Sequence, residues 1–194
     1  MNLIEKKLKE ALGLMVSRRS LLTGGLVALA SSFIPRKAFS TVKDMLVPDR
    51  SLFVYNTYTG ETLNASYWSD GQYIMDALHE INHIFRDHLT ETIETIDTNL
   101  LDLLFALKEQ LKITEPFNIV SGYRTPQTNA KLRQHKRGVA KNSLHMFGKA
   151  VDIRVPGYST KALRLAAIEL KGGGVGYYPR SAFVHMDVGE VRYW

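Results

Sequence analysis

Two short segments of this chain carry the same alternating pattern, and together they limit the folds that it can adopt. In residues 150–155 and again in 183–188, apolar side chains alternate with polar or metal-ligating ones. Successive side chains of a β-strand point to opposite faces, so each strand would be apolar on one face only. The faces that carry the candidate ligands hold Ala150, Asp152 and Arg154 in the first segment and Phe183, His185 and Asp187 in the second. Asp152 and His185 can therefore meet if the two strands are neighbours in one sheet.

The rest of the chain alternates helical and strand patterns. Apolar residues recur at helical spacing in 71–88 and again after Asp97 or Thr98, each set defining one buried stripe. Pro126 suits the first turn of a helix, and Ser159 suits an N-cap. The expected elements are a hairpin in 51–67, helices in 71–88, 97–111, 126–135 and 159–171, and strands at 117–120, 150–155, 175–178 and 182–188. We predict an α+β fold, with helices packed against a small, mostly antiparallel sheet that carries the candidate site.

Charge and cysteine content exclude several classes of function. The chain has 194 residues, 45% of them hydrophobic, which suits one domain with a substantial core. Of the 25 Lys and Arg, seven lie in residues 1–40, with two of the 19 Asp and Glu, so the remainder holds 18 basic and 17 acidic residues. A near-neutral remainder lacks the basic surface of a nucleic-acid-binding protein, and we predict no such partner. With no cysteine, disulfides and thiolate ligands are impossible.

Residues 1–40 have the features of an export signal. Paired arginines stand directly before an apolar run, in Ser17-Arg18-Arg19-Ser20-Leu21-Leu22. This run, 21–33, is too short to span a membrane, which needs about 20 apolar residues. We predict a twin-arginine signal peptide over 1–40, cut before Thr41, and hence export through the twin-arginine translocase to the periplasm without a stable membrane span. The alternative is a short amphipathic helix with a chance Arg-Arg pair, and an uncut leader acting as a weak tether also stays open.

The candidate metal ligands are two imidazoles and a carboxylate. His145 precedes the strand that carries Asp152, and Gly148 lets the chain turn back between them. With His185 these groups suit a divalent zinc ion (Zn²⁺), and three protein ligands plus water would form a catalytic rather than a structural site. In a chain with six histidines, two histidines and an aspartate are unremarkable by themselves. Any one of these residues alone is more often a satisfied surface or core group. The conjunction is what favours a metal site.

A second histidine pair needs to be weighed against this one. The H-E-x-x-H pattern of other metalloproteases occurs within the predicted helix, as His79-Glu80-Ile81-Asn82-His83. The two histidines would share one helix face, but the apolar stripe lies on the opposite face. No third ligand pattern follows. We therefore expect His79 and His83 to face solvent.

The site pattern resembles that of the M15-type (LAS-like) zinc peptidases, which cut peptidoglycan stems. The residues that carry the resemblance are Ser143, His145, Gly148, Ala150 and Asp152, with Val184-His185, and the flanking runs Ser121-Gly122-Tyr123-Arg124-Thr125 and Gly173-Gly174-Val175-Gly176-Tyr177-Tyr178. The whole chain, leader included, looks closest to the periplasmic murein endopeptidases of that family. The resemblance implies zinc ligation by His145, Asp152 and His185. It also implies peptidoglycan as substrate, with the bond between two diaminopimelate residues as the expected cross-link.

One position departs from the family pattern. Many relatives carry Glu or Asp three residues before the last histidine ligand as general base, but this chain has Ala182. Asp187 is the nearest carboxylate on the same face. Its first possible role is to act on the zinc-bound water, as general base or by orienting it, and its second is to orient a ligating histidine. Arg124 is expected to bind a stem carboxylate or to stabilise the oxyanion, and its alternative is packing on Tyr123. Tyr178 could contribute a hydroxyl.

The expected chemistry is metal-assisted amide hydrolysis of peptidoglycan cross-links. Two alternatives stay open: a carboxypeptidase that removes terminal D-alanine with the same metal, and a murein-binding module whose site is empty. The oligomeric state, the cross-link that is cut and any activating partner do not follow from the sequence.

Overall fold

The computed structural model describes residues 49–135 and 138–194. The predicted export signal and the cut before Thr41 lie outside these residues and stay predictions. No helix of the described part is long and apolar enough to cross a membrane.

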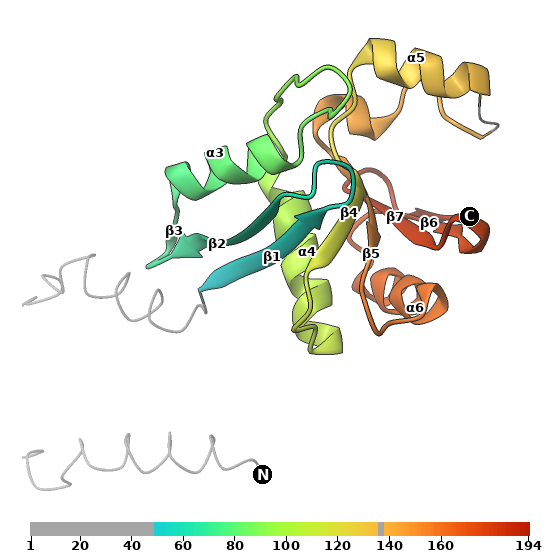
Figure 1. Ribbon diagram of the computed structural model, residues 1–194. Helices are drawn as coiled ribbons and strands as arrows, with labels where there is room; N and C mark the ends of the chain where they lie inside the picture. Colours follow the sequence, from blue (N-terminus) through green and yellow to red (C-terminus); the bar gives the residue numbers. More distant parts are fainter. Residues whose placement is uncertain (1–48, 136–137) are drawn as a thin grey trace, which may run out of the picture. The chain divides into compact units, whose positions relative to one another are not determined.

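A mixed sheet runs through the described part of the chain, with the strand order β3-β2-β1-β4-β5-β7-β6-β8 (Figure 1). Its strands are β1 Arg50–Asn56, β2 Thr62–Ser69, β3 Gln72–Tyr73, β4 Phe117–Ser121, β5 Ala150–Arg154, β6 Gly174–Tyr178, β7 Phe183–Asp187 and β8 Arg192–Tyr193. β1 pairs in parallel with β4 and β6 with β8, while the other neighbouring strands are antiparallel. The prediction of an α+β fold with a mostly antiparallel sheet is confirmed.

The helices are α3 Met75–Ile84, α4 Thr98–Leu111, α5 Pro126–His135 and α6 Thr160–Leu170, with short 3₁₀ turns η1 Leu144–Phe147 and η2 Pro179–Ser181. α4 and α6 lie side by side against one face of the sheet, and α3 packs on β2 (Figure 1). Two predicted caps are present. The Asp97 side chain accepts a hydrogen bond from the amide of Asn99, and the Ser159 hydroxyl accepts one from Ala162.

The core lies between these helices and the apolar faces of the central strands. The predicted inward residues of β5 and β7 are all buried, namely Val151, Ile153, Val184 and Met186. They meet the leucine stripe of α4, which includes Leu100, Leu104 and Leu107. Because this face is filled by packing, the opposite face of β5 and β7 is the one left for polar chemistry.

The helix predicted over 71–88 is shorter than expected at both ends. At its start, Asp70 and Gly71 both have positive φ and turn the chain from β2 into β3, so the helix begins only at Met75. The strands β3 and β8 were not predicted, because two-residue strands carry too little periodicity to be recognised.

At its end, α3 stops at Ile84 because the next polar side chains are buried and bonded elsewhere. Arg86 pairs with Glu61 at 2.7 Å and Glu91 at 2.6 Å. Asp87 accepts hydrogen bonds from the Thr125 amide and hydroxyl, both at 2.8 Å. The bonds of Asp87 hold the segment after α3 against the loop that carries Arg124 and Thr125. Both Asp87 and Arg124 line the cleft of the candidate site.

Candidate metal centre

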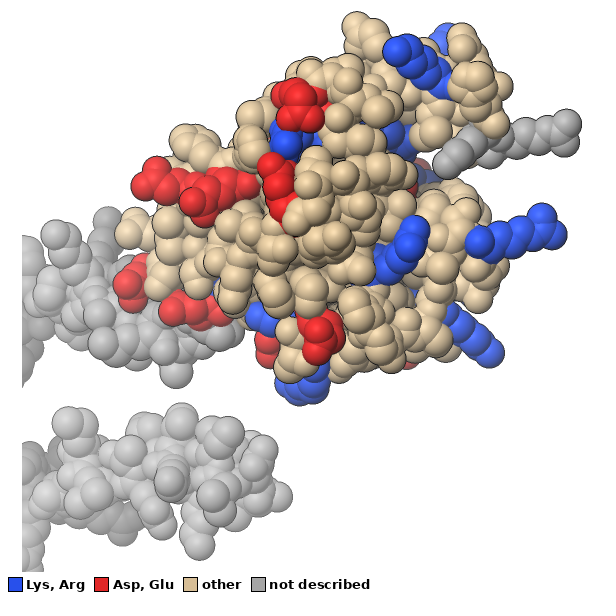
Figure 2. Space-filling model, in the orientation of Figure 1, with Lys and Arg blue, Asp and Glu red and all other residues tan. Residues whose placement is uncertain are grey.

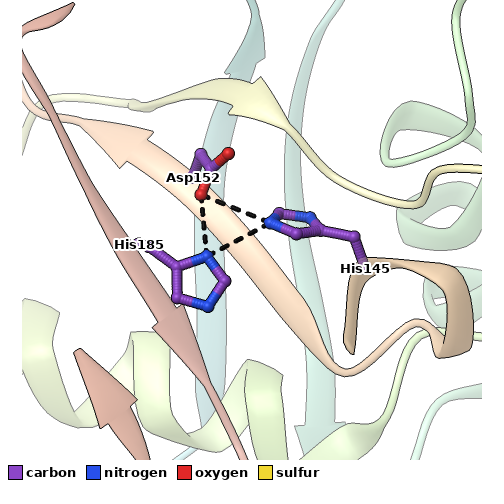
Figure 3. Close-up of side chains that lie close together, drawn as sticks. All are labelled: His145, Asp152 and His185. Carbon is purple, nitrogen blue, oxygen red and sulfur yellow. Dashed lines mark hydrogen bonds and ion pairs between the residues drawn. The ribbon is translucent and has the colours of Figure 1, made fainter. Parts of the chain in front are cut away.

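The pairing of β5 with β7 brings the first two candidate ligands together. Asp152 lies directly opposite His185 in the antiparallel register, and both side chains point to the face away from α4 and α6. His145 arrives from η1 and points at the other two (Figure 3). Gly148 ends η1 with a φ of 63°, and a Cβ there would lie 2.1 Å from the carbonyl oxygen of Thr95. Only glycine allows this turn and this close approach.

The three candidate ligand atoms form a compact triangle. Asp152 Oδ1 lies 2.9 Å from His185 Nδ1 and 3.3 Å from His145 Nε2, and the two imidazole nitrogens are 3.2 Å apart. Ligands of a tetrahedral zinc ion at about 2.05 Å would be roughly 3.3 Å from one another. The triangle therefore fits one such ion, and these three residues are a group that could hold a metal.

Both imidazoles have their second nitrogen fixed by a hydrogen bond. His145 Nδ1 donates to the carbonyl oxygen of Gly122 at 2.7 Å, because a carbonyl can only accept. His185 Nε2 donates to Asp187 Oδ2 at 3.0 Å. These bonds assign Nε2 of His145 and Nδ1 of His185 as the nitrogens free to bind a metal, and such bonds typically orient ligating histidines.

Asp187 lies behind His185 and is fully buried. Its Oδ1 accepts hydrogen bonds from the amides of Gly174 at 3.1 Å and Gly189 at 2.9 Å, and Arg192 pairs with its Oδ2 at 2.7 Å. The carboxylate thus contacts the nitrogen of His185 that points away from Asp152 and His145. Of the two roles that the sequence left open for Asp187, this position suits orientation of the histidine.

The electrostatics of the centre favour a bound cation. Burial lowers the pKa of the His145 imidazole, and the neighbouring Asp152 offsets only part of that effect. Burial acts likewise on His185, but hydrogen bonds to Asp152 and Asp187 outweigh it and raise the pKa. Burial would raise the pKa of Asp152, yet the two imidazoles hold it well below its usual range. The buried carboxylate therefore stays ionised and needs a positive partner, which a metal could supply in place of a proton.

A cleft with a volume of about 800 Å³ opens onto these three residues. Arg124 lines it and is 9% exposed, and its Nε has no hydrogen-bond partner among the described residues. Burial lowers the pKa of this guanidinium, but arginine remains charged at neutral pH. A buried cation without a full set of partners, facing a cleft, can bind an anionic group of a ligand.

The second histidine pair does not join the site. His79 and His83 are both exposed on α3, as predicted, and neither lines the cleft. Ala182 is exposed in the connection between η2 and β7, with a φ of 52°. The position that holds the general base in many relatives of the family therefore carries no acid in this chain.

Two residues that sequence reasoning missed reach the site from the C-terminal segment, one in β8 and one directly after it. Arg192 of β8 forms the ion pair with Asp187, and the ring of Trp194 lies 5.3 Å from that of His185. No feature of the sequence indicated that Arg192 would pair with Asp187. No feature of the sequence indicated the position of Trp194.

The fold and this centre define a class of protein: an α+β protein with a candidate mononuclear His–Asp–His metal centre lining an open cleft. The chain belongs to peptidase family M15_2, whose model is described as peptidoglycan L,D-endopeptidase MepK and matches residues 45–194. The family resemblance expected from the site motif is confirmed.

Individual relatives match over almost the whole chain. The peptidoglycan L,D-endopeptidase MepK of Escherichia coli strain K12 is 42% identical over 178 residues, which cover 92% of this chain and 97% of that protein. A probable peptidoglycan L,D-endopeptidase MepK of Haemophilus influenzae is 34% identical over 179 residues, covering 92% of this chain and 95% of that protein.

Proposed function

We propose that this protein is a zinc-dependent peptidoglycan endopeptidase that hydrolyses peptide cross-links of the cell wall. The observation that carries the proposal is the convergence of His145, Asp152 and His185, with ligand atoms 2.9 to 3.3 Å apart, in a member of a peptidase family. Three protein ligands beside an open cleft leave a coordination position for water or substrate, as catalytic zinc sites do.

The positions of the residues support the roles that we propose for them. A zinc ion held by the three ligands would lower the pKa of a coordinated water and polarise the scissile carbonyl. Asp187 orients His185 and fixes its tautomer. It is a poor general base because hydrogen bonds from His185, Gly189 and Gly174 outweigh burial and hold its pKa below the usual range. Arg124 binds a carboxylate of the substrate, and its charge is drawn to that group within a partly desolvated cleft.

The bond that we propose is the one between two diaminopimelate residues. The names of both relatives specify an L,D-endopeptidase, an enzyme that cuts between an L- and a D-configured centre. Diaminopimelate in the cell wall carries one centre of each kind, so a link between two of them offers such a bond. A substrate of this kind is rich in carboxylates. In Figure 2, Lys and Arg gather on the side of the molecule where α5 and β6 lie, and Asp and Glu gather towards α3.

We also propose that residues 1–40 are a twin-arginine signal and that the protein acts in the periplasm. The paired Arg18 and Arg19 before a short apolar run support this, as does a substrate that lies outside the cytoplasm. The family match from residue 45 onward is consistent with a separate leader.

The proposal is tested by digestion of purified peptidoglycan sacculi, with zinc content measured on the same preparations. Wild-type protein is expected to hold about one zinc per chain and to convert cross-linked dimers to monomers, whereas His185→Ala should do neither. His79→Ala is the control, because that histidine is exposed outside the cleft and the variant should behave as wild type. Release of free D-alanine without loss of dimers would instead show a carboxypeptidase. Binding to sacculi with neither zinc nor products would show a non-catalytic module.

A further inference from the structure

Three aromatic side chains form one wall of the cleft beside His185: Tyr178 of β6, Phe183 of β7 and Trp194, which follows β8. Tyr178 and Phe183 are direct partners across the β6–β7 pair, and their rings stack at 4.5 Å with 19° between the planes. Figure 1 shows the C-terminus beside β6, which is how Trp194 reaches this wall. We call these three residues the aromatic wall.

The backbone holds Trp194 against β6. The amide of Trp194 donates to the carbonyl of Val175 at 3.2 Å, and the amide of Tyr177 donates to the carbonyl of Trp194 at 2.9 Å. Gly176 lies directly opposite His185, and a Cβ there would come within 2.8 Å of the rings of both Trp194 and Tyr178. The indole can lie beside His185 only because position 176 has no side chain.

Tyr178 lines the cleft, and its hydroxyl has a proton that it can still donate. Trp194 Nε1 lies 2.9 Å from Tyr178 Oη. An indole N–H can only donate, so the tyrosine oxygen is the acceptor and its own O–H remains to donate elsewhere. Within residues 49–135 and 138–194, no acceptor for this proton is found. Tyr178 is thus held at its ring by Phe183 and at its oxygen by Trp194, with one hydrogen-bond donor left for a ligand.

We infer that Tyr178 is a catalytic residue that donates a hydrogen bond to the oxyanion of the tetrahedral intermediate, and that Trp194 is the positioning residue that holds its hydroxyl in place. The inference rests on the proposed peptidase function. In this role Tyr178 only donates a hydrogen bond and transfers no proton, and the bond stabilises negative charge as it develops on the carbonyl oxygen. A donor that is already oriented stabilises that charge without reorganisation, and removing one such donor typically costs on the order of 100-fold or more in kcat.

The test is Tyr178→Phe in the full-length, zinc-loaded protein, assayed on a purified cross-linked peptide dimer. Phenylalanine keeps the stack on Phe183 and removes only the hydroxyl. We expect kcat and kcat/KM to fall together by about 100-fold, with KM, zinc content and thermal stability unchanged. Tyr177→Phe is the matched control: this neighbour points to the opposite face of β6, where it packs 5.2 Å from the guanidinium of Arg164. It should match wild type.

Trp194→Phe tests the positioning role, since it keeps an aromatic ring and removes the N–H donor. We expect a smaller loss of kcat, again at constant zinc content. In the double variant with Tyr178→Phe, the Trp194 substitution should add almost nothing, because its effect acts through the missing hydroxyl. A purely structural role would give additive losses and a lower melting temperature.

Several results would overturn the inference. Wild-type kcat in Tyr178→Phe would do so, as would a change in KM alone, because the hydroxyl would then be dispensable or serve only substrate binding. Loss of zinc from Tyr178→Phe would instead show that Tyr178 supports metal binding. In each of these outcomes the wild-type enzyme is active, so the proposed function is not contradicted. A wild-type protein that cleaves no cross-link would overturn both.

Discussion

Replacing Asp187 by asparagine separates the two roles that this carboxylate could have. Its Oδ1 accepts hydrogen bonds from two backbone amides and from Arg192, and its Oδ2 accepts from Arg192 and His185. An asparagine has one oxygen and one NH₂ group, so it can accept on one side only. We expect the oxygen to stay with the side that has three donors, which turns the NH₂ group towards His185.

This reversal acts on metal binding through the tautomer of His185. An NH₂ group facing Nε2 favours the tautomer that is protonated on Nδ1, the nitrogen assigned to the metal. Binding a metal then requires two buried donors to face each other, at a cost of roughly 1–3 kcal/mol. Since about 1.4 kcal/mol corresponds to a tenfold change in affinity, zinc should bind about 10- to 100-fold more weakly to Asp187→Asn.

The assay is competition for zinc against a chelating dye, with steady-state cleavage of a cross-linked dimer measured at saturating zinc. Asp102→Asn is the matched control. Asp102 lies on α4 and also binds an arginine and a tyrosine, Arg50 at 2.6 Å and Tyr67 at 2.9 Å. Because Asp102 lies outside the cleft, the zinc affinity of Asp102→Asn should equal that of wild type. If Asp187→Asn binds zinc as tightly as wild type and loses only kcat, the reasoning is refuted and Asp187 is the general base.

Three further outcomes follow from the same structure. The double variant His79→Ala/His83→Ala should keep wild-type zinc content and activity, because both side chains are exposed on α3. Loss of zinc from this variant would show that the pair binds the metal. Gly148→Ala should lower the free energy of unfolding in urea by about 2 kcal/mol or more, because alanine is strained at a φ of 63° and its Cβ would overlap the backbone of Thr95; an unchanged midpoint would contradict this. Burial would raise the pKa of Asp87, but hydrogen bonds from threonines and a backbone amide hold it below the usual range. The stabilisation from Asp87 is therefore present above an unfolded-state pKa of about 3.9 and is lost as pH falls through the lower folded-state pKa. The free energy of unfolding of Asp87→Asn should therefore fall less steeply at acid pH than that of wild type. An identical dependence of this free energy on pH in both proteins would contradict the argument.

The sequence by itself determined the fold class, most of the helices and strands, and the residues of the candidate metal centre. The alternation in 150–155 and 183–188 placed Asp152 and His185 each on the face of its strand that is not apolar, and the structure pairs the two residues directly. The helical stripe in α4 and the caps at Asp97 and Ser159 were also predictable. These features follow from periodicities and hydrogen bonds within a few residues, which the order of the amino acids fixes locally.

Only the tertiary structure decided how the centre is supported. The hydrogen bond from His145 to the carbonyl of Gly122 spans 23 residues, and that from Trp194 to Tyr178 spans 16. The role of Asp187 depended on which nitrogen of His185 it contacts, and the end of α3 depended on bonds that bury the next polar side chains. Such contacts depend on the relative placement of whole strands and loops. Local sequence patterns carry no information about that placement, because the same short run can lie beside many different partners.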